Sequence, residues 1–146
     1  MKKIYLTWEY FNDLLDILVT KIKNSDEEFN SIYAIPRGGL VIGVCLSHKL
    51  NIPLVDERLI NDNTLIVDDI SDMGTTLVKY YCDGLAIATL FSTDWTISKP
   101  DWFVVKKLNR KEWIVFPWEN NMTERQTTLN EFKKEEKKED DTNTEK

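Results

Sequence analysis

Two short segments of the sequence combine residue types that can bind a charged small molecule. The first reads LIVDDISDMGTTL from Leu65, so an apolar stretch leads to Asp68 and Asp69, then to Asp72 and a Gly-Thr-Thr sequence beginning at Gly74. Glycine permits close backbone approach, threonine hydroxyls can donate hydrogen bonds, and free amides at a helix start attract phosphate. Carboxylates beside a phosphate repel a sugar phosphate unless they bind its hydroxyls or a divalent cation. The segment therefore predicts a site for a phosphorylated ribose with Mg²⁺.

The second segment reads IPRGGL and also follows an apolar stretch. Gly38 and Gly39 expose backbone amides and Arg37 adds a positive charge, a combination that suits a pyrophosphate group. Taken alone, these three residues more often form a simple tight turn. Two such segments on one sheet favour binding, because open α/β sheets bind ligands beyond the carboxyl ends of their strands.

Hydropathy patterns indicate the elements that would carry these segments. Apolar residues recur at helical spacing over residues 8–22, with Thr7 available as N-cap. A second helix is predicted over residues 40–50, and a third is opened by the Gly-Thr-Thr turn and ends near Tyr81. Short apolar runs predict strands over residues 31–35, 64–68, 85–92, 102–106 and 113–116. Strands that alternate with helices predict an α/β fold whose parallel sheet is flanked by helices.

Composition and charge bound the class of protein. The 146 residues, 42% apolar and 30% charged, fit one globular domain, which we expect over residues 1–120. The run KKEEKKEDDTNTEK holds no apolar residue, so residues 121–146 are predicted to form a charged, partly disordered tail. The net charge of −6 argues against nucleic-acid binding. Apolar runs too short for a membrane span, and an N-terminus without a signal-like apolar region, predict a cytoplasmic protein.

The single histidine and the two cysteines indicate little chemistry. His48 stands at the polar end of a predicted helix and is expected on the surface, and one histidine cannot build a zinc site of several imidazoles. Cys45 and Cys82 stand apart without a metal or redox spacing and are predicted to be reduced thiols. Acid–base chemistry, if present, therefore depends on carboxylates.

The segments described so far resemble the type I phosphoribosyltransferases, and in particular the bacterial xanthine-guanine phosphoribosyltransferases. The family pattern is an apolar strand, two acids, two variable positions, a further acid and a Thr-Gly-x-Thr-like phosphate loop, which LIVDDISDMGTTL follows. The resemblance extends from about Leu6 to Glu119 and includes Leu6–Glu9, Ala34–Val41 and Trp113–Glu119. It implies a phosphoribosyltransferase-like parallel sheet flanked by helices.

The resemblance also implies an activity. Members of the family transfer ribose 5-phosphate from 5-phosphoribosyl-1-pyrophosphate to the glycosidic nitrogen of a purine base and release pyrophosphate. For this chain the implied bases are guanine, xanthine and hypoxanthine, the implied cofactor is Mg²⁺, and the implied role is nucleotide salvage. Dimers or tetramers are common among the relatives, so a homo-oligomer is expected.

Residue roles follow from the same resemblance. Asp68 and Asp69 would hold the ribose hydroxyls and Mg²⁺, and Asp72 would face the purine N7 and assist proton transfer. The 5′-phosphate would bind the segment formed by Asp72, Met73, Gly74, Thr75 and Thr76.

The remaining implied contacts involve the leaving group and the base. Arg37 and Gly38 would bind pyrophosphate, and the peptide bond that enters the residue equivalent to Arg37 is often cis in the family. Trp113 and Ile114 would contact the base by stacking and by backbone hydrogen bonds, although tryptophans at such positions often serve only as core or interface aromatics.

Three departures from the family pattern leave other interpretations open. Only residues 57–63 are available for the long flap that closes over the reaction centre in relatives, and Met73 replaces a hydroxyl residue of the phosphate loop. Thr93 replaces the lysine that reads the exocyclic oxygen of the base, and Lys99 is available nearby. The alternative function is a phosphoribosyl-pyrophosphate-binding sensor or regulator with little catalysis. A phosphatase-like or receiver-like acidic pocket is a further alternative.

Overall fold

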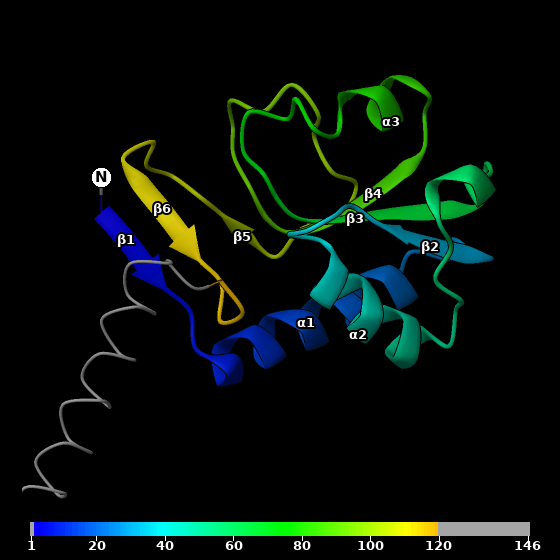
Figure 1. Cartoon of the computed structure of the whole chain (residues 1–146), viewed down its shortest axis with the longest axis horizontal. Helices are drawn as coiled ribbons and strands as arrows, with labels where there is room; N and C mark the ends of the chain where they lie inside the picture. The colour runs from blue at the N-terminus through cyan, green and yellow to red at the C-terminus, as the bar shows by residue number, and fades with distance from the viewer. Residues whose placement is uncertain (1, 120–146) are drawn as a thin grey trace, which may run out of the picture.

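The computed structural model of the chain describes residues 2–119 (Figure 1). Within this range, one sheet contains four parallel strands in the order β2, β3, β4, β5. Their bounds are Ser31–Ala34 for β2, Thr64–Ser71 for β3, Ala86–Ser92 for β4 and Val105–Lys106 for β5. The predicted α/β fold with a parallel sheet is therefore confirmed. The charged tail predicted over residues 121–146 lies outside the described residues.

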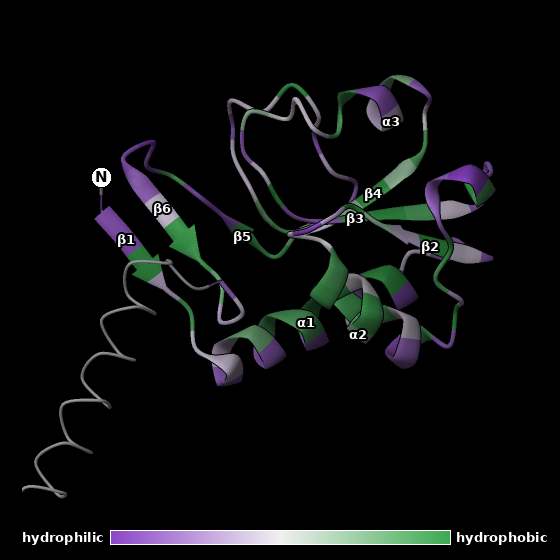
Figure 2. Cartoon of the chain, in the orientation of Figure 1, coloured by the Kyte–Doolittle hydropathy of each residue, from purple (hydrophilic) through white to green (hydrophobic). Residues whose placement is uncertain are grey.

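Helices cover both faces of this sheet. Helices α1 (Trp8–Lys23) and α2 (Leu40–Leu50) lie on one face, and the short α3 (Val78–Cys82) lies on the other (Figure 1). Side chains alternate along the strands, so Ile32 packs toward α1 and α2 whereas its neighbour Tyr33 packs toward α3. Figure 2 shows the apolar side of α1 turned toward the sheet and its polar side turned outward, whereas α2 is apolar along most of its length.

Helix α1 forms where the sequence predicts it. The Thr7 hydroxyl accepts a hydrogen bond from the Tyr10 amide at 3.1 Å, which satisfies one of the free amides of the first turn. The buried side of the helix consists of Phe11, Leu14, Leu15, Leu18, Val19 and Ile22. These positions recur every three or four residues, so their burial against the sheet follows from the helical repeat.

A second, two-stranded sheet lies beside the first. Strand β1 (Lys2–Tyr5) pairs in parallel with β6 (Glu112–Val115), from the other end of the described chain. The sequence analysis predicted β6 but not β1, whose residues are mostly exposed and lack a buried pattern. Beyond β6, the Phe116 ring stacks on Trp118 at 4.9 Å, and Trp118 contacts Phe11 of α1 edge-on at 5.1 Å. This aromatic contact fixes the small sheet to the main core.

Several predicted bounds were wrong near the candidate site. Strand β3 was expected to end at Asp68, but it continues to Ser71 because Ile70 and Ser71 pair with the end of β4. Helix α3 was expected to open at the Gly-Thr-Thr turn, but residues 75–77 form a turn and α3 begins at Val78. The expected strand over 102–106 is reduced to β5 and one bridge at Trp102.

Residues 57–63, the expected short flap, form a compact connection. They contain a 3-10 helix, Glu57–Leu59, capped by the Asp56 carboxylate, which accepts the Arg58 amide at 2.8 Å. The Glu57 carboxylate also pairs with Lys79 of α3. The segment is therefore tied to the sheet at its α3 face. In the described part of the chain, none of the helices has the length and apolar character needed to cross a membrane.

Close packing between α2 and β2 generates a first testable prediction. A Cβ atom added at Gly43 would overlap the Ala34 side chain, so only glycine fits there. Gly→Ala inside a helix commonly stabilises a protein by up to about 1 kcal/mol, but Gly43→Ala should lower the free energy of unfolding by roughly 1–3 kcal/mol through overpacking. Urea denaturation measures the change. Val44→Ala, at an exposed position of the same helix, is the control and should be close to neutral; a stabilised Gly43→Ala variant would contradict the packing.

Candidate active site

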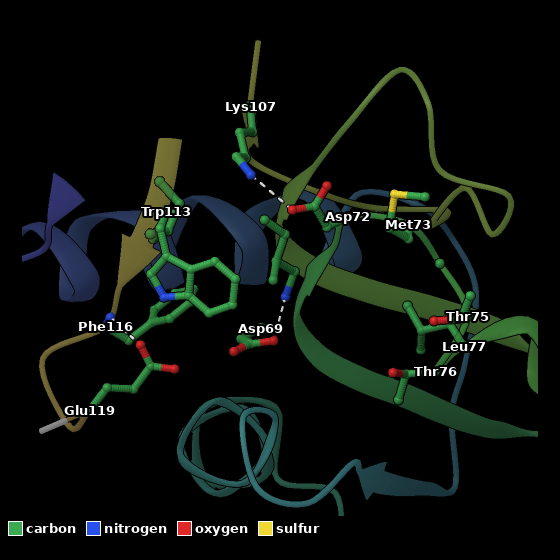
Figure 3. Close-up of a pocket in the computed structure, with 13 residues that line it drawn as sticks. Asp69, Asp72, Met73, Thr75, Thr76, Leu77, Lys107, Trp113, Phe116 and Glu119 are labelled. Atoms are coloured by element: carbon green, nitrogen blue, oxygen red, sulfur yellow. Dashed lines mark hydrogen bonds and ion pairs between the residues drawn. The ribbon is translucent and has the colours of Figure 1, made fainter. Parts of the chain in front are cut away.

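A cavity of about 360 Å³ opens at the carboxyl ends of β3 and β5 and extends to β6 (Figure 3). This volume is within the usual range for small-molecule sites. Most of the residues predicted from the sequence line it, namely Asp69, Asp72, Met73, Gly74, Thr75, Thr76, Trp113 and Ile114. In Figure 3, the acids lie between Trp113 on one side and the threonines on the other. The cavity therefore joins segments that are about forty positions apart in the sequence.

Three predicted residues lie outside the cavity lining. Asp68 is buried in β3 with 7% of its surface exposed. Gly38 lies directly against Asp69, since a Cβ atom at Gly38 would overlap that carboxylate. Arg37 is exposed on the same loop, and the peptide bond between Pro36 and Arg37 is cis, as the resemblance implied. The IPRGGL loop and the acidic segment therefore touch, but the Arg37 guanidinium is not part of the cavity wall.

Glycine is required where the IPRGGL loop meets the end of the sheet. A Cβ atom at Gly39 would approach the Val67 carbonyl to 2.5 Å and the Ile35 carbonyl to 2.9 Å. The Gly39 amide donates to the Ile35 carbonyl at 2.8 Å, closing the turn. This close approach holds Gly38 beside β3, which leaves its backbone next to the Asp69 carboxylate.

The two adjacent acids of β3 are largely withdrawn from water. Burial raises the pKa of Asp68 to about 8, and the charge of Asp69 adds to that effect. Burial also raises the pKa of Asp69 above its ordinary value. The Asp68 side chain accepts a hydrogen bond from the Asp69 amide at 2.9 Å, and the Asp69 side chain accepts one from the Ile70 amide at 2.7 Å. The two carboxyl groups also interact with each other. Within residues 2–119 no lysine or arginine forms an ion pair with either acid.

An acidic pair of this kind fits a divalent cation. Mg²⁺ in proteins is commonly bound by one or two carboxylates, with substrate oxygens and water completing its coordination. Asp69 lines the cavity and Asp68 lies next to it in the strand, so the pair offers two such ligands. Among the described residues, no group of three or more histidine, cysteine or acidic side chains is arranged to hold a metal ion by itself. Substrate oxygens would therefore have to supply much of the coordination.

Asp72 has the opposite electrostatic environment. Its Oδ2 accepts a hydrogen bond from the Lys107 ammonium at 2.8 Å, and its Oδ1 accepts one from the Trp95 indole N–H at 2.8 Å. Partial burial alone would raise the pKa of Asp72, but these two hydrogen bonds and the charges of Lys107 and Arg110 outweigh it and lower the pKa. Asp72 is therefore held as a carboxylate that faces the cavity.

The turn after Asp72 is braced from behind. Gly74 adopts φ +84°, which favours glycine, and a Cβ atom there would overlap the Thr96 hydroxyl. The buried Ser98 hydroxyl donates to the Gly74 carbonyl at 2.7 Å. Thr75 and Thr76 stay exposed at the cavity, and Met73, which also lines it, has 55% of its surface exposed. The Ser98 hydrogen bond occupies the Gly74 carbonyl, so the amides and hydroxyls of the turn are the groups available to a phosphate, although α3 begins only at Val78.

The other end of the cavity is aromatic. Trp113, 53% exposed, and Ile114 project from β6, and the buried Phe116 ring lies below them. Glu119 closes this end, and its carboxylate accepts the Phe116 amide at 3.0 Å. Burial raises the pKa of Glu119, and the nearby charge of Asp69 adds to the rise. The apolar surface suits a flat heterocycle, and the acids beside it add negative potential.

The sequence analysis missed several residues of this site. Lys107 and Glu119 line the cavity and Trp95 contacts Asp72, yet none belongs to a phosphate or acidic motif. Thr93, at the position of the expected lysine, donates its hydroxyl to the Asp72 carbonyl at 2.7 Å and is buried. Lys99 lies in a separate small pocket next to Thr93. A buried lysine next to a predicted acid could have been found only from the fold.

Known proteins resemble this chain in sequence and in fold. No family model matches the chain. A purine phosphoribosyltransferase structure from Pyrococcus horikoshii is 33% identical with a TM-score of 0.68, and the match covers 83% of this chain and 97% of that one. Xanthine-guanine phosphoribosyltransferase from Desulfotalea psychrophila is 25% identical over 142 residues, 81% of this chain and 88% of that protein. The xanthine-guanine-hypoxanthine phosphoribosyltransferase structure from Helicobacter pylori shares the fold at 20% identity, with a TM-score of 0.68 over 86% of this chain and 99% of that one. The chain therefore belongs to the type I phosphoribosyltransferase family of enzymes, and within it to the purine phosphoribosyltransferases.

Proposed function

We propose that the protein transfers ribose 5-phosphate from 5-phosphoribosyl-1-pyrophosphate to guanine, xanthine or hypoxanthine, with Mg²⁺, and releases pyrophosphate. The observation that supports this most is that one cavity brings together the groups that a purine nucleotide would need. It is lined by the Gly-Thr-Thr turn, by Asp69, by Asp72 with its Lys107 partner, and by the aromatic wall at Trp113. In Figure 3 the acids lie between the threonines and Trp113, which suits a ribose between a phosphate and a base.

In this proposal the substrate lies along the cavity. The 5′-phosphate accepts hydrogen bonds from the backbone amides and hydroxyls of Thr75 and Thr76 beside Gly74, and the ribose hydroxyls face Asp69. Pyrophosphate lies against the backbone at Gly38, with the exposed Arg37 free to swing toward it. The base lies against Trp113 and Ile114, with its N7 toward Asp72. Each of these contacts involves a residue that lines the cavity or adjoins it.

The chemistry breaks the bond between ribose C1′ and a pyrophosphate oxygen and forms a bond from C1′ to the glycosidic nitrogen of the base. Positive charge develops on the ribose as pyrophosphate departs, so acids below the ring stabilise the transition state. Asp72 accepts the N7 proton of the base. Its lowered pKa keeps the side chain ionised, so that a carboxylate is available to take this proton. When bound, Mg²⁺ neutralises charge on the leaving pyrophosphate. Asp68 and Asp69 would hold it.

A second candidate function is binding of phosphoribosyl pyrophosphate by a sensor or regulator with little catalysis. Two observations favour it: the connection over residues 57–63 is a compact turn tied to α3, and Met73 supplies no hydroxyl to the phosphate turn. Less cover over the cavity admits water, which weakens transfer to a base. Binding of the donor without turnover would support this function over the first. The cytoplasmic location and the homo-oligomer stay predictions.

Replacing Asp72 tests the proposed enzyme. Asp72→Asn removes the proton acceptor but keeps the shape of the side chain, so kcat for guanine should fall about 100-fold or more, while the Kd for phosphoribosyl pyrophosphate with Mg²⁺ stays nearly unchanged. Spectrophotometric assay and calorimetry measure the two quantities. Asp83→Asn, at an exposed position after α3, is the matched control and should behave as the native protein. Undiminished turnover by Asp72→Asn would exclude Asp72 as the acceptor.

The buried acids predict a pH-dependent stability. Because the pKa of Asp68 is raised to about 8 in the folded state, its stabilising protonated form is lost as pH rises through that value. Without Mg²⁺, the melting temperature should therefore fall by several degrees between about pH 6 and pH 9, since about 1 kcal/mol corresponds to roughly 4 °C in a domain of this size. Added Mg²⁺ should restore much of the loss at high pH.

Two variants make this measurement specific. Asp68→Asn removes the charge and keeps the oxygen that accepts the Asp69 amide, so its melting temperature should change less with pH. His48→Gln, at the exposed end of α2, should keep the full decrease of the native protein. Equal pH profiles for Asp68→Asn and the native protein would show that the acidic pair is not the origin.

A further inference from the structure

The strongest feature that the proposed function leaves unexplained is the ammonium group of Lys107. Its side chain is only 5% exposed, and Lys107 is the one lysine among residues 2–119 that is buried. A lysine is rarely buried unless it is paired, because removing its charge from water is costly. Lys107 lines the cavity together with Trp113 and Asp72 (Figure 3). The chain therefore places a positive group at the aromatic end of the site.

The backbone explains how Lys107 reaches this position. It directly follows β5, and its amide donates to the Ser92 carbonyl at 2.8 Å, which extends the pairing with β4 by one residue. Successive side chains of an extended strand point to opposite sides. Lys106 accordingly points outward and pairs with Asp94 at 2.8 Å, whereas Lys107 points into the cavity.

The hydrogen bonds of the ammonium leave room for a ligand. Lysine carries three N–H donors and no acceptor. One donor goes to Asp72 Oδ2 at 2.8 Å, and within the described range this is the single hydrogen bond of the group. The other two donors are therefore available to an acceptor that enters the cavity. The Asp72 carboxylate also keeps accepting capacity, because each of its oxygens has more than one lone pair.

Lys107 and Asp72 together form a two-point site for one edge of a purine. On that edge, N7 is adjacent to the group at position 6, which is an oxygen acceptor in guanine and an amino donor in adenine. A free base that carries its proton on N7 would donate to Asp72 and accept from Lys107 through the oxygen. An amino group at position 6 would instead face the ammonium, donor against donor.

We propose that Lys107 is the residue that selects a 6-oxo base over a 6-amino base in this protein. The inference rests on the proposed function. Lys107 belongs to none of the motifs named for the family resemblance, and neither Thr93 nor Lys99 is placed for this role. Thr93 uses its hydroxyl on the Asp72 carbonyl, and Lys99 lies in another pocket. We expect strong selection because the buried Lys107 ammonium would face no acceptor when a 6-amino base is bound, and an unpaired buried polar group costs more free energy than an exposed one.

Hypoxanthine and adenine form the most direct test, because they share one ring system and differ in the group at position 6 and in the proton on N1 that accompanies it. The experiment compares kcat/KM for both bases in the full chain with phosphoribosyl pyrophosphate and Mg²⁺. The native protein should favour hypoxanthine, and Lys107→Met should reduce the hypoxanthine-to-adenine ratio by about 10- to 100-fold, which is the usual effect of a hydrogen bond to a charged group. Lys107→Arg should retain part of the ratio. The control Lys106→Met, whose side chain points away from the cavity, should leave it unchanged.

The ratio separates base selection from damage to the site. Lys107→Met also removes a partner of Asp72. Loss of that partner should lower the turnover of both bases by the same factor, and a common factor cancels in the hypoxanthine-to-adenine ratio. If that variant fails to fold, Asp72→Asn/Lys107→Met leaves no unpaired charge, and its affinities for the nucleotides of hypoxanthine and adenine can be measured by calorimetry. Asp72→Asn should still prefer the hypoxanthine nucleotide, and the double variant should not.

The remaining outcomes separate failure of the proposed function from failure of the role of Lys107. A native protein that is inactive with every purine base overturns the proposed function and this inference with it. An active native protein that prefers adenine, or whose base ratio is the same in Lys107→Met, overturns the role of Lys107 alone. A double variant that keeps the nucleotide preference of Asp72→Asn does the same.

Discussion

Two like charges held side by side in the central strand constrain the whole site. Asp68 and Asp69 are consecutive residues of β3, and β4 pairs with this part of the strand. Burial makes both carboxyl groups costly to charge, and their interaction with each other adds to that cost for Asp68. The fold tolerates this pair because Gly38 leaves space beside it and a cation can neutralise it. A divalent cation and the hydroxyl groups of a sugar would turn this unfavourable pair of acids into favourable contacts.

Asp72 shows how a third acid nearby can have the opposite property. It lies just past the end of β3, where Lys107 and Trp95 reach it from two other segments. Its pKa is lowered whereas those of the strand acids are raised. Environments that separate the pKa values of neighbouring acids also separate their roles. The strand acids suit a metal and a sugar, and Asp72 suits a proton.

Local sequence patterns predicted much of the fold. Helix α1 and β2, which depend on periodicity and a cap within a few residues, were predicted to within a residue. The errors occurred where distant segments decide the outcome. Strand β3 extends to Ser71 because β4 offers partners, and α3 begins late because the turn at Gly74 is held by Ser98. Strand β1 forms only because β6 pairs with it.

The candidate site divides in the same way. The acidic motif and the glycine loop were predicted because their chemistry lies in consecutive residues. Lys107 was missed because an isolated lysine in a sequence is typical of the surface. Its burial depends on the register of β5 with β4, which places it opposite Asp72 from thirty-five positions away. Arg37, which has the composition of a pyrophosphate ligand, remains exposed on its loop.

The pairing of β1 with β6 also bears on how the protein is made. Because the residues at 2–5 find their partners only at 112–115, the aromatic wall of the cavity cannot assemble until nearly all of this range has left the ribosome. The sheet that carries the acids needs only the preceding residues and can form earlier. Biosynthesis would thus build the sugar-phosphate half first and the half that distinguishes bases last.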